Sequence, residues 1–173
     1  AQSHGISFYP PTADHIEAAL REIQNSWLRH YAAYSGPDDP LWWRGMFYSL
    51  SMAIPVGEGV CFLTDHMLLP LSWNRDAYYL ACALLSWSQA KEQTHQAVRR
   101  HLIWMFEIAK RVDGAWGRSY LANGMIKDPS FQLDQQVFPL LELAEYVLET
   151  GDRTTFQRLE GHMYAILDML FAR

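Results

Sequence analysis

One segment of the sequence, TDHMLLPLSWNRDAYYL, brings charged and aromatic side chains together where a polar loop meets an apolar, periodic stretch. Arg75 and Asp76 stand there beside Trp73, Tyr78 and Tyr79. Aromatic faces stack on sugar rings, and charged groups hydrogen-bond vicinal hydroxyls, so this combination is typical of a carbohydrate site. A second explanation is open. The Asp76 carboxylate can simply cap a helix, with Arg75 as a local ion-pair partner and the tyrosines in the core, and spacing alone favours this explanation.

A second segment, WGRSYLANGMIKDPSFQLDQQ, offers Lys127, Asp128 and Asp134 around two glycines. A carboxylic acid on such a long polar loop can act as a general acid toward a leaving oxygen. The neighbouring Phe131 can raise the pKa of that acid by removing water from it. The structural alternatives are that Asp134 caps the helix that follows it, and that Asp128 belongs to an Asp-Pro turn.

Other kinds of site find little support. The seven histidines contain no i, i+4 pair, and the sequence lacks a G-x-S-x-G element and a glycine-rich phosphate loop. We therefore expect no metal and no cofactor. The two cysteines, Cys61 and Cys82, do not make a disulfide framework, and their apolar surroundings are typical of buried free thiols.

The composition limits the classes of partner. The chain has 173 residues, of which 50% are hydrophobic and 14% aromatic, so it has ample material for one core. Its net charge is −5, and no basic run is present to neutralise a phosphate backbone, which argues against nucleic acid. No apolar stretch approaches the roughly 20 residues of a membrane span, so we expect no membrane association and a cytoplasmic protein.

The elements that must position these side chains are all predicted to be helices. Helical spacing of apolar residues marks six segments, and no segment gives a convincing strand. The expected helices span residues 13–34, 41–54, 77–89, 92–112 and 135–150, and a sixth helix continues to the last residue. Gly151 closes the fifth helix, and Asp152 can cap the sixth. Two loops of about 20 residues, 55–75 and 113–133, separate three pairs of helices. Long loops of this kind are usually functional. The pattern predicts one all-α domain over residues 1–173, built from the helical hairpins of an α/α toroid.

Both segments resemble elements of the six-hairpin glycoside hydrolases, the (α/α)6 barrels that include the glucoamylases and the glucosidase domain of glycogen debranching enzymes. SWNRDAYYLACALL resembles the W-x-R-D-A element of glucoamylases. FQLDQQVFPLLELAEYVLETGD resembles the Q-L-D element of glucoamylases and is also similar to an element of the debranching glucosidases. SYLANG takes the place of a glycine-containing loop of those families. The resemblance covers about half of the chain, residues 64–152.

The resemblance implies roles for particular residues. Arg75 and Asp76 would hold hydroxyls of the terminal sugar, with Trp73 and Tyr78 shaping the walls. Asp134 takes the place of the general acid if the debranching-type match is correct. If the glucoamylase-type match is correct, Asp134 is structural and the acid is a glutamate in a later hairpin. Lys127 and Asp128 would line the entrance to the site.

The length departs from the family pattern, because a six-hairpin barrel needs on the order of 350 to 400 residues and three hairpins are visible here. Inverting hydrolysis requires a second carboxylate across the sugar, and the chain offers no candidate for it. We therefore expect part of an exo-acting, inverting hydrolase of α-glucosides or related oligosaccharides, inactive alone. A homodimer or association with a complementary C-terminal half would complete it. The alternative is a non-catalytic helical interaction module that pairs through an exposed apolar face.

Overall fold

The computed structural model describes residues 12–18, 21–22, 40–64, 69–87 and 90–173. Two units are distinguished, Ala1–Asp38 and Asp39–Arg173, and each is described by itself. In the first unit, residues 13–18 and 21–22 are helical, and the rest of the helix predicted over 13–34 lies outside the described residues. All the elements named below belong to the second unit.

The prediction of an all-α chain is wrong, because part of the second unit pairs as small antiparallel sheets. Helix α2 (Pro40–Ser51) ends three residues earlier than expected, and β1 (Ala53–Val56) follows it. β1 pairs with β2 (Gly59–Phe62) across a two-residue turn. Gly57 opens this turn at a φ of 57°, a backbone conformation that glycine adopts without strain and that matches the twist of a tight hairpin.

Strands also occupy the end of the helix predicted over 92–112 and part of the second predicted loop, 113–133. β3 (Arg111–Val112) pairs with β4 (Ala115–Trp116), and β5 (Ser119–Tyr120) pairs with β6 (Ile126–Asp128). The fold is therefore mixed, with three two-stranded sheets between helices in the part of the chain that the structure describes.

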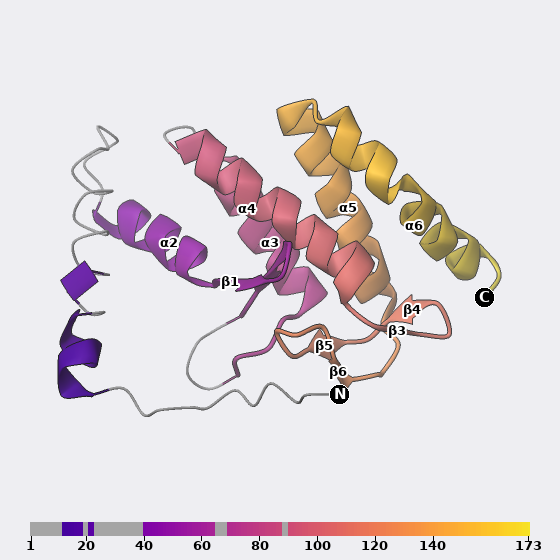
Figure 1. The fold of residues 1–173 in the computed structure, drawn as a ribbon. Coiled ribbons are helices and arrows are strands. Elements are labelled where there is room, and N and C mark those ends of the chain that lie inside the picture. Colours follow the sequence, from indigo (N-terminus) through magenta and orange to yellow (C-terminus); the bar gives the residue numbers. More distant parts are fainter. Residues whose placement is uncertain (1–11, 19–20, 23–39, 65–68, 88–89) are drawn as a thin grey trace, which may run out of the picture. The chain divides into compact units, whose positions relative to one another are not determined.

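Four helices pack around these sheets: α3 (Asn74–Leu85), α4 (Lys91–Ile103), α5 (Leu133–Thr150) and α6 (Arg153–Phe171). Figure 1 shows α4, α5 and α6 side by side, with α3 behind α4. α3 packs on both α4 and α5, and α5 packs on α6. The helix predicted over 92–112 is wrong beyond residue 108, because α4 continues as a π-helical turn, η2 (Trp104–Ile108), and then passes into β3.

The core lies where β2 meets α4 and η2. Every residue of β2 is buried, and so are the side chains of Trp104, Met105 and Phe106 in η2. A strand that is buried on both faces shows no alternation of polar and apolar residues. Among the described residues, no helix has the length and apolar character needed to cross a bilayer.

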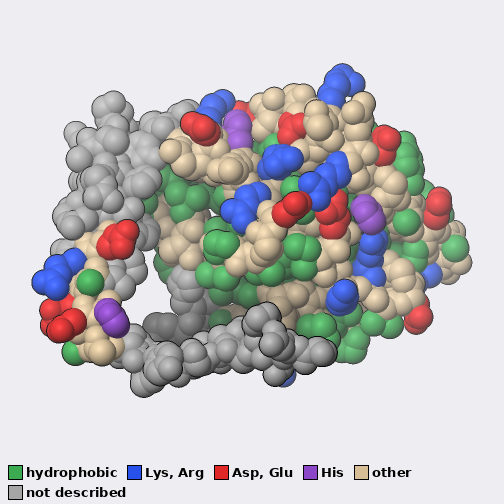
Figure 2. All heavy atoms as spheres, viewed as in Figure 1, with side chains coloured by type: hydrophobic (Ala, Val, Ile, Leu, Met, Phe, Trp, Pro, Cys, Tyr) green, Lys and Arg blue, Asp and Glu red, His purple; other side chains and the backbone are tan. Residues whose placement is uncertain are grey.

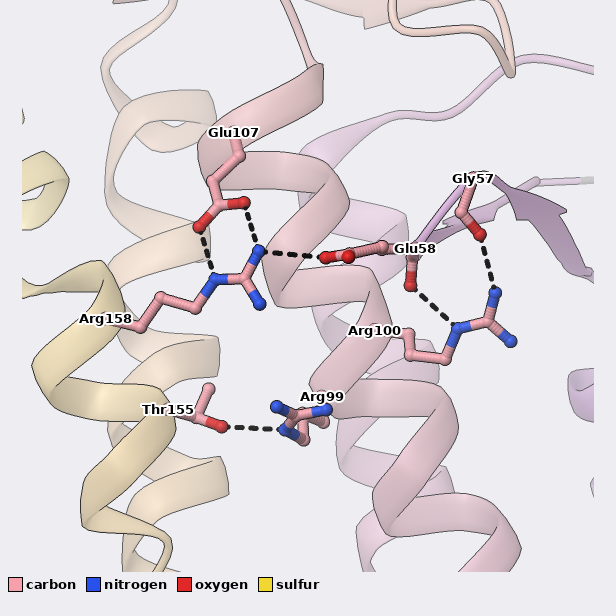
Figure 3. A network of polar contacts seen from close by, with 7 residues as sticks. All are labelled: Gly57, Glu58, Arg99, Arg100, Glu107, Thr155 and Arg158. Carbon is pink, nitrogen blue, oxygen red and sulfur yellow. Dashed lines mark hydrogen bonds and ion pairs between the residues drawn. The ribbon is translucent and has the colours of Figure 1, made fainter.

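A polar network ties α6 and the β1–β2 turn to this core (Figure 3). Arg158 of α6 donates to both carboxylate oxygens of Glu107, at 2.7 and 2.6 Å, and to Glu58 at 3.1 Å. Arg100 donates to the backbone carbonyls of Gly57, Glu58 and Gly59. Figure 2, which keeps the view of Figure 1, shows acidic and basic side chains next to one another on the face where Figure 1 places α4. The network gives Arg100, Glu107 and Arg158 structural partners.

Gly59 provides a test of this core. A Cβ built at Gly59 would lie 2.7 Å from Trp104 Cβ and 3.1 Å from Trp104 Cα. Because the second of these atoms is backbone, Gly59→Ala should destabilise the protein by about 1–3 kcal/mol in urea unfolding. Gly45→Ala is the matched control, since a Cβ there meets nothing within 4 Å. Equal unfolding midpoints for the two variants would contradict this packing.

Candidate functional site

The N-terminal ends of α3 and α5 lie against each other, and two hydrogen bonds join them. Asn74 Nδ2 donates to the Gln135 carbonyl at 2.8 Å, and the backbone amide of Arg75 donates to Gln135 Oε1 at 3.3 Å. The first amides of a helix have no partner inside it, and Trp73, the N-cap residue of α3, provides no side-chain hydrogen bond. α3 is therefore capped by a side chain of a different helix.

This junction brings together two of the predicted site residues. Arg75 Nη1 lies 3.3 Å from Asp134 Oδ2, and the two side chains are 51% and 40% exposed. Asp76 and Asp134 both lie inside the first turns of their helices, where a carboxylate is favourable, but neither provides the cap. The capping explanation is therefore wrong for both. The ion pair is within reach of a ligand in solution.

Aromatic side chains lie one helical turn from the ion pair. Tyr79 follows Arg75 by four residues, and Phe138 follows Asp134 by four, so each lies on the same helix face as the charged residue before it. The rings of Tyr79 and Phe138 are 5.8 Å apart between centroids, and Tyr78 contacts both. Tyr78 was a predicted site residue, but Phe138 was not. The i+4 spacing of Phe138 from Asp134 was the signal that could have identified it.

Asp76 points in a different direction from Arg75. It lines an open pocket of about 330 Å³ together with Tyr79, Tyr48 and Thr64. Tyr79 and Tyr48 are 61% and 52% exposed, so the pocket presents aromatic surface beside a carboxylate. Tyr79 therefore links the Asp76 pocket to the aromatic contact near Arg75 and Asp134.

Trp73 contacts a third charged group. The guanidinium of Arg118 lies 5.1 Å from the Trp73 ring, and it pairs with Asp128 at 3.5 Å. Hydrogen bonds from Ser130, with a smaller contribution from Arg118, hold the pKa of Asp128 below its usual value. Asp128 also makes the predicted turn, because its Oδ1 accepts from the Ser130 amide at 2.9 Å. Lys127 is exposed on β6 beside this group.

The loop that carries Arg118 is fixed to the two helices. Ser72 and Tyr120 exchange backbone hydrogen bonds of 2.9 Å, which pins β5 to the residues before α3. Gln136 accepts from the Trp116 amide at 2.8 Å and donates to the Trp116 carbonyl at 2.9 Å. Sequence reasoning overlooked Gln136 and its neighbour Gln135, although two consecutive amides at a helix start are a recognisable polar signal.

No family model, curated protein or solved structure matches the chain. Function is therefore argued from the geometry of this end of the molecule, which we call the helix-end site: Trp73, Arg75, Asp76, Tyr79, Arg118, Asp128, Asp134 and Phe138.

The helix-end site offers hydrogen-bond donors, acceptors and aromatic faces, but no metal centre. Among the described residues, no three His, Cys, Asp or Glu side chains lie close enough to hold an ion. Three polar atoms at this end are buried without a hydrogen-bond partner: Asn74 Oδ1, Arg118 Nε and Gln135 Nε2. Their burial puts these atoms out of reach of a ligand, and the side chains at this end that a ligand can reach include those of Arg75, Asp76, Tyr79 and Asp134. Such an arrangement is suited to a ligand rich in hydroxyl groups.

Proposed function

We propose that the helix-end site binds the terminal sugar of an α-glucoside or related oligosaccharide, and that the chain serves exo-acting, inverting glycoside hydrolysis. The observation that carries this proposal is the exposed Arg75–Asp134 ion pair, one turn from the contact between Tyr79 and Phe138. A charged pair beside an aromatic face is the combination that holds vicinal hydroxyls and the apolar side of a sugar ring.

The proposal assigns a role to each charged group. The Arg75 guanidinium donates to sugar hydroxyls, and Asp76 accepts from a hydroxyl in the pocket that it shares with Tyr79 and Tyr48. Asp134 is the candidate general acid, and in its ion pair with Arg75 it is also placed to accept from a hydroxyl. Trp73 and Arg118 form a wall of the site, with Lys127 and Asp128 at its entrance.

A titration with maltotriose followed by two-dimensional amide NMR tests the proposal. We expect the amide signals of Arg75, Asp76, Arg118 and Asp134 to shift in a saturable manner. Cellotriose, which contains the same sugar in β linkage, should shift them less. Shifts confined to residues far from this end, such as those of α6, would contradict the proposed site.

A second candidate function, an interaction module that pairs with another copy of the chain, is favoured by one surface. Leu133, Leu141 and Leu148 lie along one side of α5 and are 62%, 42% and 81% exposed. Two such leucine rows can pack against each other, with the exposed Glu145 on the same side of α5. If this function is correct, light scattering should give a mass near twice 20.0 kDa, and Leu141→Glu should return the monomer. A wild-type monomer at high concentration would rule this function out.

A further inference from the structure

Helix α5 contains a proline in its interior, Pro139, at a buried position directly after Phe138 of the helix-end site. Pro139 has no backbone N–H, so it cannot donate to the carbonyl of Gln135 four residues earlier. In a regular helix a proline ring also clashes with the carbonyl of the residue four positions earlier. A proline at such a position ordinarily costs about 3 kcal/mol relative to alanine.

The carbonyl that Pro139 leaves without a helical donor finds one in the neighbouring helix. Asn74 Nδ2 donates to it at 2.8 Å, and Asn74 is 1% exposed. Asn74 is the first residue of α3, and the next residue, Arg75, donates its amide to the side chain of the same glutamine. Gln135 therefore accepts two hydrogen bonds from the first turn of α3, one at its backbone carbonyl and one at its side-chain oxygen.

We infer that Pro139 is a positioning residue: by freeing the Gln135 carbonyl for Asn74, it fixes the register of α3 against α5 and so places Arg75 beside Asp134. The residues follow one another in a short chain of contacts. Asn74 is adjacent to Arg75, and Gln135 is adjacent to Asp134. The hydrogen bond between Asn74 and Gln135 therefore also fixes where Arg75 lies relative to Asp134. Only the last step, from register to sugar binding, rests on the proposed function.

A double-mutant cycle tests the first step. In Pro139→Ala, the new backbone amide of residue 139 can donate to the Gln135 carbonyl. This helical hydrogen bond would replace the one from Asn74. We expect Asn74→Ala to raise the unfolding equilibrium constant about tenfold in the protein with Pro139. In the Pro139→Ala background the same substitution should raise it less than threefold. Equal effects in both backgrounds would overturn the inference.

The functional readout separates positioning from a general effect on stability. Pro139→Ala improves helix propensity, so its urea midpoint should not fall, and yet we expect it to weaken maltotriose binding about fivefold. Gly161→Ala is the matched control. It improves helix propensity in α6, and a Cβ there meets nothing within 4 Å. This control should gain stability with unchanged binding. If Pro139→Ala lowers stability and binding together, Pro139 only fills space and the inference fails.

The two proposals fail in distinguishable ways. If the wild-type protein does not bind maltotriose, the proposed function is wrong, and the unfolding cycle still decides whether Pro139 and Asn74 are coupled. If the protein binds the sugar but the cycle shows no coupling, the site stands and the positioning role of Pro139 is wrong.

Discussion

Arg75→Ala should weaken the binding of maltotriose about tenfold to a hundredfold while leaving the unfolding free energy within about 0.5 kcal/mol of wild type. The guanidinium is half exposed, so its ion pair with Asp134 contributes little to stability. Its charged hydrogen bonds to a bound sugar are instead made in a partly dehydrated site, where each contributes more. Isothermal titration calorimetry and urea unfolding on the same preparations measure the two quantities.

The structure offers a matched control at the opposite end of α5. Lys91 Nζ pairs with Glu149 Oε1 at 2.7 Å, and these side chains are 53% and 39% exposed, close to the values for Arg75 and Asp134. Lys91→Ala removes a comparable ion pair far from the helix-end site. It should leave sugar binding unchanged. A similar loss of binding in both variants would mean that Arg75 acts through general electrostatics and not through contact with the ligand.

Asp134 can act as a general acid or only hold a sugar hydroxyl. Hydrolysis assays of Asp134→Asn in an active assembly distinguish these two roles. As a general acid, Asp134 protonates the leaving oxygen, so its loss should slow maltose hydrolysis by about 100-fold to 10,000-fold. The same loss should matter far less for a nitrophenyl α-glucoside, whose leaving group needs little protonation. As a group that only holds a hydroxyl, Asp134 should matter equally for both substrates.

The second large effect concerns pH and a buried pair on the inner side of α5. Glu142 and His101 are 1% and 0% exposed, and Glu142 Oε2 lies 3.7 Å from His101 Nε2. His101 Nδ1 lies 3.0 Å from the Val60 carbonyl, to which it donates as a neutral ring. Burial raises the pKa of Glu142 well above its usual value and lowers the pKa of His101 to about 4. Burial therefore favours the neutral form of both groups in the folded protein.

The two groups act on stability in opposite directions. The pKa of His101 is lower in the folded protein, so its contribution to stability is lost as the pH falls from 6.5 to about 4, by about 3 kcal/mol. The pKa of Glu142 is raised, so its contribution is lost as the pH rises above 4.5 toward the folded value. Of these two groups, mainly His101 changes the stability with pH below pH 4.5, and only Glu142 changes it above pH 6.5.

We therefore expect the stability of the wild-type protein to fall with rising pH above 6.5, where His101 no longer offsets Glu142, by at most about 1.4 kcal/mol per pH unit. Glu142→Gln, which keeps the shape without the titration, should remove this slope. Urea unfolding at pH 6.5, 7.5 and 8.5 measures it. Glu149→Gln is the control, because the pKa of the exposed Glu149 is lowered by Lys91 and this group does not titrate in that range. Parallel curves for wild type and Glu142→Gln would contradict a protonated Glu142.

The local parts of the fold were predictable from sequence, because their signals lie within a few residues. Helix α5 was expected over residues 135–150 and spans 133–150. Gly151 ends it at a φ of 69°, and the Asp152 side chain accepts from the Thr155 amide at the start of α6. A left-handed glycine and a capping aspartate are short-range determinants, and both act as expected.

The β1–β2 hairpin was missed for a physical reason. β2 is buried on both faces, so its sequence, GVCF, lacks the alternation that marks a strand, and the apolar residues before it extend the helical pattern of α2. The dipeptide Gly57-Glu58 between two short apolar runs was the available signal for a tight turn.

The helix-end site was predicted in its residue types but not in its connections. Arg75 and Asp134 were both singled out, yet nothing local shows that they meet, because they are 59 positions apart. The link between them runs through Asn74 and Gln135, whose hydrogen bond spans 61 positions. Only tertiary packing brings such residues together, and a single sequence carries no direct sign of it.

The capping of α3 by α5 has a consequence for how the chain folds. The acceptor for the Arg75 amide is the Gln135 side chain, 60 positions further along, so this hydrogen bond cannot form until Gln135 has been synthesised. During synthesis α3 therefore leaves the ribosome with an unfinished first turn, and its frayed end closes only when α5 docks. Closing a loop of that length is slow compared with the growth of a helix. The step that assembles the helix-end site is thus also expected to be a late step in folding, and the two helix ends become ordered together.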